Sequence, residues 1–518
     1  MIRRFINKAI WLFVKKIPWK PILIWGPWMV ILLAVGFYGI ENWRGARAWE
    51  KARLSANKEG ISLNLQDYFP EPHPDGFDPT QLPILDGEKT QSFKLKISKG
   101  YSGLNSGSAG RDAIRTTNRW KAESRDIRLW LDPANGPYTH EEAAIELQRI
   151  GQLELDRLRL LVEHSKGQKL IFRPTSATPT FKELSQANLI SLLRAHQIAG
   201  EDTLIALAVG NDEQTLDNLR LMSSLIQSES YSTLLSFLLN HTGLISFEHV
   251  TWEAIVGDHL SREQLKELEV MFAQIDITRQ LSEMLIAELL FSLTALENSK
   301  SNKDELAQTI LGVTEFGLFT KIKTGWPPAD QLFWKIDKFI LKRIPSGWID
   351  LCKAEILLQT LSMHRKFKKE GFEGIASHDI QTSTTHFLGN IYAQEVLSMY
   401  QKSAAKASYT EALIRIARIG IALEIWRKNN GEYPESLSKF TTLPLEDPFS
   451  GKAFGYRLKA DQTPIVWSVG RNRIDENGIP GFTKEEGDIV WQLTPIPDLT
   501  EADLKKKLRK HRVKRELF

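Results

Sequence analysis

The chain has 518 residues, 42% hydrophobic and 25% charged, and this length exceeds one ordinary domain, so we expect two or three folded units. A mean hydropathy of -0.26 excludes a protein that crosses a membrane many times, so any membrane contact must be local. With 67 basic and 63 acidic residues the net charge is only +4, which gives no whole-chain signal for nucleic-acid binding, and the single cysteine excludes intramolecular disulfide bonds.

Residues 1–20 and 21–40 predict a basic interfacial helix followed by one transmembrane helix. The first segment interleaves lysine and arginine with large apolar residues, as in helices that lie on an anionic membrane surface. The second, PILIWGPWMVILLAVGFYGI, carries no charge, and a helix of about 20 residues spans about 30 Å, the thickness of a bilayer core. Trp25 and Trp28 near one end and Tyr38 and Trp43 near the other lie where aromatic rings prefer the membrane interface.

Two kinds of processing compete with a retained anchor. Residues 46–48 read Ala-Arg-Ala, a formal signal-peptidase site, but the apolar run is long and Arg44 precedes the site. Residues 36–41 look like a type IV pilin processing motif, in which the glutamate opens the hydrophobic helix; here the hydrophobic stretch precedes Glu41. We therefore expect a retained single-pass anchor. A type II secretion-associated subunit would instead require cleavage after Gly36.

The distribution of basic residues predicts the orientation of this anchor. Lysines and arginines precede it, so the positive-inside rule favours a cytoplasmic N-terminus, although Arg44, Arg47 and Lys51 follow on the other side. The expected location is a bacterial inner membrane, with the bulk of the chain in the periplasm.

Residues 41–138 predict a charged helix, a proline-rich linker and short strands. The helix is expected to end near residue 67, before Pro70, Pro72 and Pro74, which favour an extended linker. A short alternating run at 92–97 and a Gly/Ser stretch at 100–111 follow. The latter matches neither the phosphate-binding nor the nucleophile-elbow pattern, so we interpret it as a loop.

Residues 139–407 predict an α-helical domain, an irregular array of helices. Capping boxes, which satisfy the free amides of a first helical turn, mark three helix starts. They are Thr139 with Glu142, Thr180 with Glu183, and Ser261 with Gln264. Apolar residues recur between them at three- and four-residue spacing, so the helices must pack on one another. Residues 191–229 are similar to a helical hairpin of the tetratricopeptide sort, with a turn at 210–212, but no fixed period recurs elsewhere.

A stretch within this domain places large apolar side chains among lysines. They are Phe333, Trp334, Ile336, Phe339, Ile340 and Ile344. Such a face packs in a core, against a partner helix or on a membrane, and core burial is our expectation.

Residues 408–498 predict a long helix and a small β-rich module. The helix is expected from about Ser408 to the Asn-Asn-Gly stop at 429–431, and strand-like runs follow. The order Tyr-Pro at 433–434, Asp-Pro-Phe-Ser-Gly at 447–451 and Ser-Val-Gly at 468–470 resembles the C-terminal half of type II secretion pseudopilins. The resemblance implies a presented α+β module of that kind.

The same resemblance implies a calcium site in the loop after the Ser-Val-Gly strand. Its counterparts are Asp475, Asn477 and Asp488, whose oxygen atoms beside Gly478 suit a hard cation. Asx turns alone would also account for Asp475 and Asn477. Calcium is the one cofactor that the sequence raises.

The whole arrangement looks like a group of uncharacterised single-pass bacterial envelope proteins, which implies the lipid bilayer and other envelope proteins as partners. The tail, residues 499–518, is rich in lysine and arginine. We expect it to be solvated or to contact anionic lipid, and nucleic acid becomes a candidate partner only if the C-terminus is cytoplasmic.

No closely spaced set of metal-ligating or catalytic side chains is evident in the sequence. The histidines are scattered without an H-E-x-x-H motif, and carboxylates such as Glu141 and Glu142 sit at helix starts, where the helix dipole favours them. Cys352 has apolar neighbours typical of an inert core thiol. We therefore predict a non-catalytic envelope scaffold or interaction protein; the alternative is an envelope hydrolase whose site gathers His241, His249 or His259 with a carboxylate from separate helices.

Overall fold

The computed structural model describes a subset of the chain, to which every structural statement below refers. These residues are 19–68, 76–77, 82, 127, 131, 139–166, 168–172, 187–228, 233–301, 335–336, 338–339, 342–376, 387–480 and 486–493. They are mostly helical and include a small three-stranded sheet, which confirms the predicted mainly-α class. The chain divides into two compact units, each described here by itself.

Unit 1 comprises Met1–Leu63, Ser292–Ser362 and Asp379–Ser398. Its first element is α2 (Trp19–Lys58), an unbroken helix that joins the predicted span to the charged helix expected after it. This helix ends at Lys58 rather than near residue 67, because the chain turns at Gly60, which has a positive φ of 71°. A short 3₁₀ helix, η1 (Leu65–Tyr68), follows, in unit 2.

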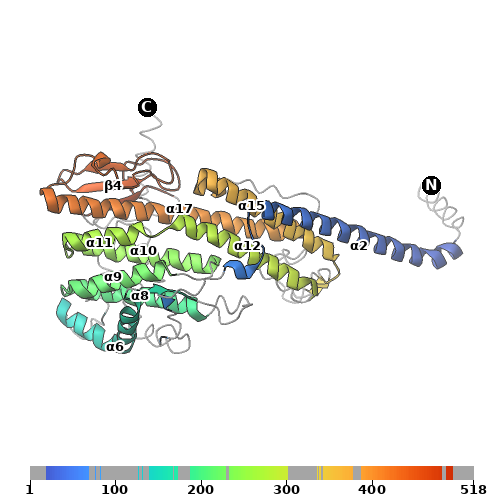
Figure 1. Ribbon diagram of the computed structural model, residues 1–518, viewed down its shortest axis with the longest axis horizontal. Coiled ribbons are helices and arrows are strands. Elements are labelled where there is room, and N and C mark those ends of the chain that lie inside the picture. The colour runs from blue at the N-terminus through green and yellow to red at the C-terminus, as the bar shows by residue number, and fades with distance from the viewer. Residues whose placement is uncertain are drawn as a thin grey trace, which may run out of the picture. The chain divides into compact units, whose positions relative to one another are not determined.

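Parts of three other described helices belong to unit 1. They are the end of α12 (Ile277–Ser301), the beginning of α15 (Ser346–Glu370) and the beginning of α17 (Phe387–Asn430). Glycines let α2 and α15 touch backbone to backbone, since a Cβ at Gly45 would overlap the main chain of Gly347. Figure 1 shows α2 and α15 side by side.

Unit 2 comprises Asn64–Phe291, Met363–His378 and Met399–Phe518. It contains α6 (His140–Ser165), α8 (Ala187–Ala208), α9 (Asp212–Ile226), α10 (Leu234–Val256) and α11 (Arg262–Ala273). In Figure 1, α8 packs on α9 and α10, and α6 contacts both α8 and α9. The short strands β1 (Gly76–Phe77) and β2 (Lys169–Leu170) pair in parallel.

Local signals in the sequence correctly mark several helix ends of unit 2. The Thr139–Glu142 and Ser261–Gln264 capping boxes are both formed, and the Thr180–Glu183 pair lies outside the described residues. The predicted hairpin is also confirmed. After α8, Gly210 has a positive φ of 68° and Asn211 caps α9 by accepting a hydrogen bond from the Gln214 amide.

The helix α17 (Phe387–Asn430) is the longest of the described elements. It begins well before the expected residue 408, because residues 387–408 contain no proline and continue the helical pattern. Its end is as predicted: Gly431, with a positive φ of 82°, donates its amide to the Arg427 carbonyl at 2.8 Å. A short helix, α16 (Phe372–Ala376), follows α15.

The C-terminal sheet is antiparallel, in the order β3 (Gly455–Leu458), β4 (Pro464–Ser468), β5 (Ile489–Gln492). A short 3₁₀ helix, η6 (Leu437–Lys439), precedes it. The small β-rich module is therefore confirmed. A Cβ at Gly420 would overlap the Trp491 ring, so the sheet rests directly on α17, and the Trp252 indole of α10 donates to the Gln492 carbonyl at 2.9 Å.

Several predictions fall outside the described residues. They are the basic helix at 1–20 apart from its last two backbone positions, the proline-rich linker at 70–74, the strand at 92–97, the Gly/Ser stretch at 100–111, Phe333, Trp334 and Ile340 of the apolar stretch, and the basic tail from 499.

Candidate functional site

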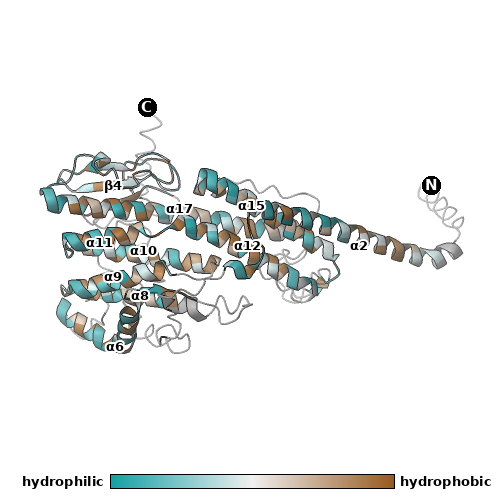
Figure 2. Ribbon diagram, viewed as in Figure 1, coloured by the Kyte–Doolittle hydropathy of each residue, from teal (hydrophilic) through white to brown (hydrophobic). Residues whose placement is uncertain are grey.

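The apolar segment of α2, defined here as residues 25–40, is exposed on every side of the helix. Its large apolar side chains have exposed fractions from 40% at Tyr38 to 69% at Trp25 and Leu32, and residues 29–33 are exposed without interruption. Figure 2 shows brown and pale colours along this half of α2, whereas the other helices carry more teal among the brown. Burial begins abruptly at the end of the segment, from 59% exposed at Ile40 to 6% at Glu41.

The predicted transmembrane span includes this segment. Among the residues that the structure describes, no helix combines the length and the apolar character needed to cross a membrane. The side chains of residues 21–24, which belong to the predicted span, are not among those described.

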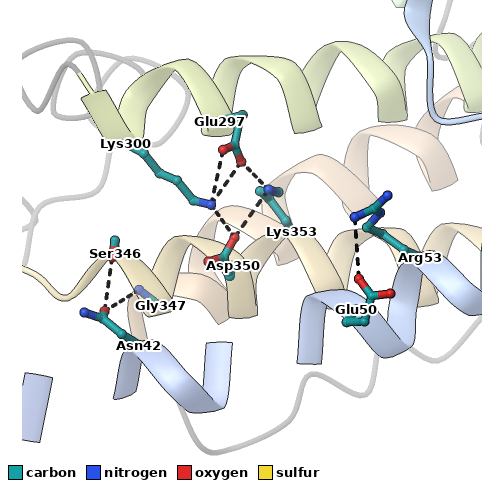
Figure 3. A network of polar contacts seen from close by, with 9 residues as sticks. All are labelled: Asn42, Glu50, Arg53, Glu297, Lys300, Ser346, Gly347, Asp350 and Lys353. Carbon is teal, nitrogen blue, oxygen red and sulfur yellow. Dashed lines mark hydrogen bonds and ion pairs between the residues drawn. The ribbon is translucent and has the colours of Figure 1, made fainter. Parts of the chain in front are cut away.

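A polar collar closes the apolar segment, formed by Glu41 and Asn42 of α2 with Ser346, Gly347 and Trp348 of α15. The Asn42 side-chain oxygen accepts from the Gly347 amide at 2.9 Å and from the Ser346 hydroxyl at 3.1 Å, so it caps the first turn of α15 from another helix (Figure 3). The Trp348 indole donates to Glu41 at 2.9 Å. The collar thus fixes the end of the apolar segment to α15 by directed hydrogen bonds.

Two more contacts hold the collar. Arg44 pairs with Glu41 at 2.7 Å, so this buried carboxylate has a charged partner. The Tyr38 hydroxyl, at the last turn of the apolar segment, donates to the Arg343 carbonyl. In the sequence, Glu41 is notable only as part of a pilin-like motif. Its contact with α15 could not be predicted, because the residues involved lie some 300 positions away in the chain.

A four-charge network, shown in Figure 3, lies between α12 and α15 in unit 1. Lys353, which is 3% exposed, bonds Glu297 and lies 3.3 Å from Asp350, while Lys300 lies 2.6 Å from Asp350 and 3.1 Å from Glu297. Partial burial raises the pKa of Glu297, but hydrogen bonds from Lys353 and Lys300 outweigh it and hold that pKa below its usual value. The Lys353 ammonium also lies 4.1 Å from the Trp49 ring centre, which connects the network to α2.

The predicted calcium ligands have structural partners within the module. Asp475 accepts from the Trp467 indole at 3.0 Å and from the Asn477 amide at 2.9 Å, an Asx turn. Asp488 accepts from the amides of Glu476 at 3.2 Å and Gly478 at 2.6 Å, and burial raises its pKa to about 8. Over the described part of the chain, no group of three or more His, Cys, Asp or Glu side chains could hold a metal. The calcium site remains a prediction.

The histidines of the hydrolase alternative have separate partners. His241 of α10 contacts the Thr410 hydroxyl of α17 through Nδ1, and His249 is buried further along α10. His259, after α10, lies 3.7 Å from Asp212 at the start of α9. The His259–Asp212 contact brings one of these histidines to a carboxylate, as the hydrolase alternative requires, but neither residue lines the cavity of about 350 Å³ in unit 2.

Unit 2 contains two buried ionisable groups, His196 and Glu248, whose burial was not predicted from the sequence. His196 of α8 packs over Gly243 of α10, where an added Cβ would lie 2.8 Å from its ring, and burial lowers its pKa to about 3. Glu248 of α10 is 3% exposed, and burial raises its pKa to about 8. Local sequence patterns do not reveal this burial, because the neighbours that bury these groups come from other helices.

The buried Glu248 gives unit 2 a predictable pH dependence. Its pKa rises from an ordinary 4.5 to about 8 on folding, so the folded state retains a proton that the unfolded chain releases. Its contribution to stability is complete below about pH 4.5 and is lost as the pH rises to about 8, at about 1.4 kcal/mol per pH unit. We expect Glu248→Gln, which cannot ionise, to gain stability relative to wild type by that increment in this range, as measured by denaturant unfolding at pH 5, 6, 7 and 8.

Asp488 also titrates in this range, but it is present in both proteins. Its contribution therefore cancels in the difference between the two free energies of unfolding. Glu146→Gln on α6 is the matched control, because hydrogen bonding to Arg149 holds the pKa of Glu146 below its usual value and the side chain stays ionised over the whole range. Its stability curve should run parallel to that of wild type. A Glu248→Gln curve parallel to wild type would contradict the prediction.

A cavity of about 350 Å³ lies in unit 2. Its lining includes Lys169 of β2, Arg220 and Ser223 of α9, Gln227 directly after α9, and Glu267 of α11. Arg220 forms two hydrogen bonds to Glu267, at 2.5 and 2.8 Å, and one to Asp217 at 2.8 Å, so its charge is already neutralised. The lining also has an apolar part, Leu170, Val270 and Met271, and it includes none of the three histidines of the hydrolase alternative.

Comparison with known proteins adds no function to this geometry: no family model, no curated protein and no solved structure matches the chain.

Proposed function

We propose that this protein is a single-pass, membrane-anchored scaffold of the bacterial envelope, without catalytic activity, in which residues 21–40 cross the bilayer. The observation that carries the proposal is the uninterrupted exposure of residues 29–33 on α2, followed at once by burial of Glu41 in the collar. An exposed apolar surface of this kind is typical of a membrane or partner contact. Because the side chains are exposed on all sides, a surrounding lipid phase accounts for them better than a partner docked on one face.

Transfer of the apolar segment from water into a bilayer is expected to be strongly favourable. Fully burying one Val, Leu, Ile, Met or Phe side chain is worth about 1.5 to 3 kcal/mol, so transfer of the apolar segment into hydrocarbon gains on the order of 10 kcal/mol. The helix satisfies its own backbone groups, and Pro27 is tolerated in membrane helices. Trp25 and Trp28 at one end and Tyr38 and Trp43 at the other are then at the interfaces.

The scaffold assignment is supported by what the buried polar groups do. Glu41 and Asn42 join α2 to α15, and the carboxylates of the terminal module accept main-chain and indole hydrogen bonds. These roles are structural. The pseudopilin-like order of the terminal module favours presentation of that module to other envelope or secretion proteins, with the N-terminus cytoplasmic and the bulk of the chain periplasmic.

We expect Leu32→Arg with Leu33→Arg to release the protein from membranes. Each arginine near a bilayer centre costs about 2.5 to 3.5 kcal/mol, and the pair lies in the middle of the apolar segment. The measurement is the fraction of protein that stays with the membrane pellet after alkaline extraction. The matched control is Ile145→Arg with Leu153→Arg on α6, two apolar residues that are 67% and 58% exposed; that protein should remain in the pellet. Extraction of the unmodified chain by alkali would overturn the anchor.

Reporter fusions at the C-terminus test the orientation. A periplasmic reporter signal is expected. A cytoplasmic one would remove the periplasmic scaffold and make nucleic acid a candidate partner of the basic tail. An N-terminus that begins after Gly36 would favour the secretion-subunit alternative. The hydrolase alternative requires a histidine and a carboxylate in one pocket; His259 lies 3.7 Å from Asp212, but neither residue lines the cavity of unit 2.

A further inference from the structure

A basic and aromatic patch lies beside the end of the apolar segment in unit 1. It consists of Lys335, Lys338 and Phe339, which are helical, and Lys342 and Arg343 in the turn that follows; their spacing of three and four residues suits one face of a helical turn. The Lys342 amide donates to the Lys338 carbonyl at 3.2 Å, the hydrogen bond of a helical turn. Core burial was expected for this stretch; it holds for Ile344, at 8% exposed, but not for Phe339, at 57%.

The patch is attached to the apolar segment at a defined level. The Tyr38 hydroxyl donates to the Arg343 carbonyl, and Tyr38 precedes the last residue of the segment, Ile40, by two positions, about 3 Å along a helix. The Arg343 main chain therefore lies where the proposed hydrocarbon core ends.

The composition of the patch suits that level. The Arg343 guanidinium lies 3.5 Å from the centre of the Phe339 ring, so an exposed aromatic ring and a fixed cation sit together. Residues 335–343 carry four basic side chains and one acidic one, Asp337, a formal charge of +3. Aromatic rings prefer the membrane interface, and cations there attract anionic headgroups.

We infer that this patch binds anionic phospholipid headgroups and seats Phe339 in the interface, beside the proposed transmembrane helix. The inference rests on the proposed anchor and adds a lipid preference to it. Each lysine or arginine close to an anionic surface strengthens the attraction about five-fold, so the contact should depend on headgroup charge.

The test uses the full chain in vesicles, with a fluorophore at Phe339→Cys. The native thiol does not compete, because Cys352 is 5% exposed and burial raises its pKa to about 12. In vesicles of phosphatidylcholine with 30% phosphatidylglycerol we expect quenching of the label by acrylamide, a neutral aqueous quencher, to fall several-fold relative to pure phosphatidylcholine. Lys335→Gln, Lys342→Gln and Arg343→Gln together should abolish that difference; the Arg343 carbonyl that Tyr38 binds remains.

The matched control is Lys266→Gln, Lys439→Gln and Lys452→Gln, three exposed residues of unit 2, which should keep the lipid dependence. Equal quenching in both lipids, whether high or low, while the protein floats with the vesicles would overturn the headgroup site and leave the anchor intact. Failure of the protein to float with either vesicle would overturn the anchor and the patch together.

Discussion

Asp447→Ala is expected to destabilise the terminal module by about 3 to 5 kcal/mol. The Asp447 side chain is 1% exposed and accepts four hydrogen bonds, from the Phe449 and Val469 amides and the Ser450 and Ser468 hydroxyls, at 2.8 to 3.1 Å. It thereby connects the 447–451 turn to the end of β4. Without the carboxylate, the Phe449 and Val469 amides have no hydrogen-bond acceptor, and each unsatisfied amide costs about 1 to 3 kcal/mol of stability. The hydrogen bonds to a charged acceptor are lost as well.

The measurement is hydrogen exchange of the β4 and β5 amides in the full chain, which reports the module rather than the whole molecule. Asp461→Ala is the matched control. Asp461 accepts from the Thr463 amide and hydroxyl in the β3–β4 turn, but it is exposed, so exchange in the strands should barely change. Equal effects of the two substitutions would show that Asp447 is not the connection inferred here.

Asp447 also shows what its motif contributes. The Asp-Pro-Phe-Ser-Gly run was singled out in the sequence because it resembles a pseudopilin motif. In the structure, its first residue, Asp447, has a structural role as a hydrogen-bond acceptor. Gly451, with a positive φ of 65°, donates to the Asp447 carbonyl at 2.9 Å and closes the turn. Whether the module shares the pseudopilin role remains part of the proposal.

Features that depend on neighbouring residues were predictable from sequence. The capping boxes at Thr139 and Ser261, the hairpin turn at Gly210 and the helix stop at Gly431 each need only a few consecutive positions. The small sheet was predictable for the same reason, since its strands are short, apolar and bounded by turns. The beginning of α17 was missed because no Ser/Thr-x-x-Glu/Gln capping box immediately precedes Phe387 in the sequence, whereas the apolar pattern is clearest after Ser408.

Features that depend on distant residues were not predictable. Glu41 finds Trp348, and Glu248 of α10 lies close enough to Tyr409 of α17 to raise the pKa of that phenol further after burial has raised it. Single-sequence patterns carry no information on such pairs. The calcium prediction shows a different difficulty: the sequence pattern of Asp475 and Asp488 is compatible with two roles. The same carboxylates serve equally well as acceptors for local amides.

The buried lysine of unit 1 gives the second large effect. We expect Lys353→Met to cost about 3 kcal/mol, because it leaves Asp350, itself 8% exposed, with Lys300 as its one remaining cation in the network. Methionine keeps the length of the apolar stem, so the loss reports charge and not packing. The measurement is amide exchange of α15 within residues 349–362.

Arg53→Gln is the control shown in the same view (Figure 3): Arg53 and Glu50 are separated by 3.5 Å with both side chains more than half exposed, and its loss should change stability by less than about 0.5 kcal/mol. A further variant separates charge from structure. Lys353→Met with Asp350→Leu removes both buried charges and leaves Lys300 paired with Glu297 at 3.1 Å, so most of the stability should return. If this double variant is as unstable as Lys353→Met alone, the Lys353 charge contributes through Trp49 and Glu297 instead of through Asp350.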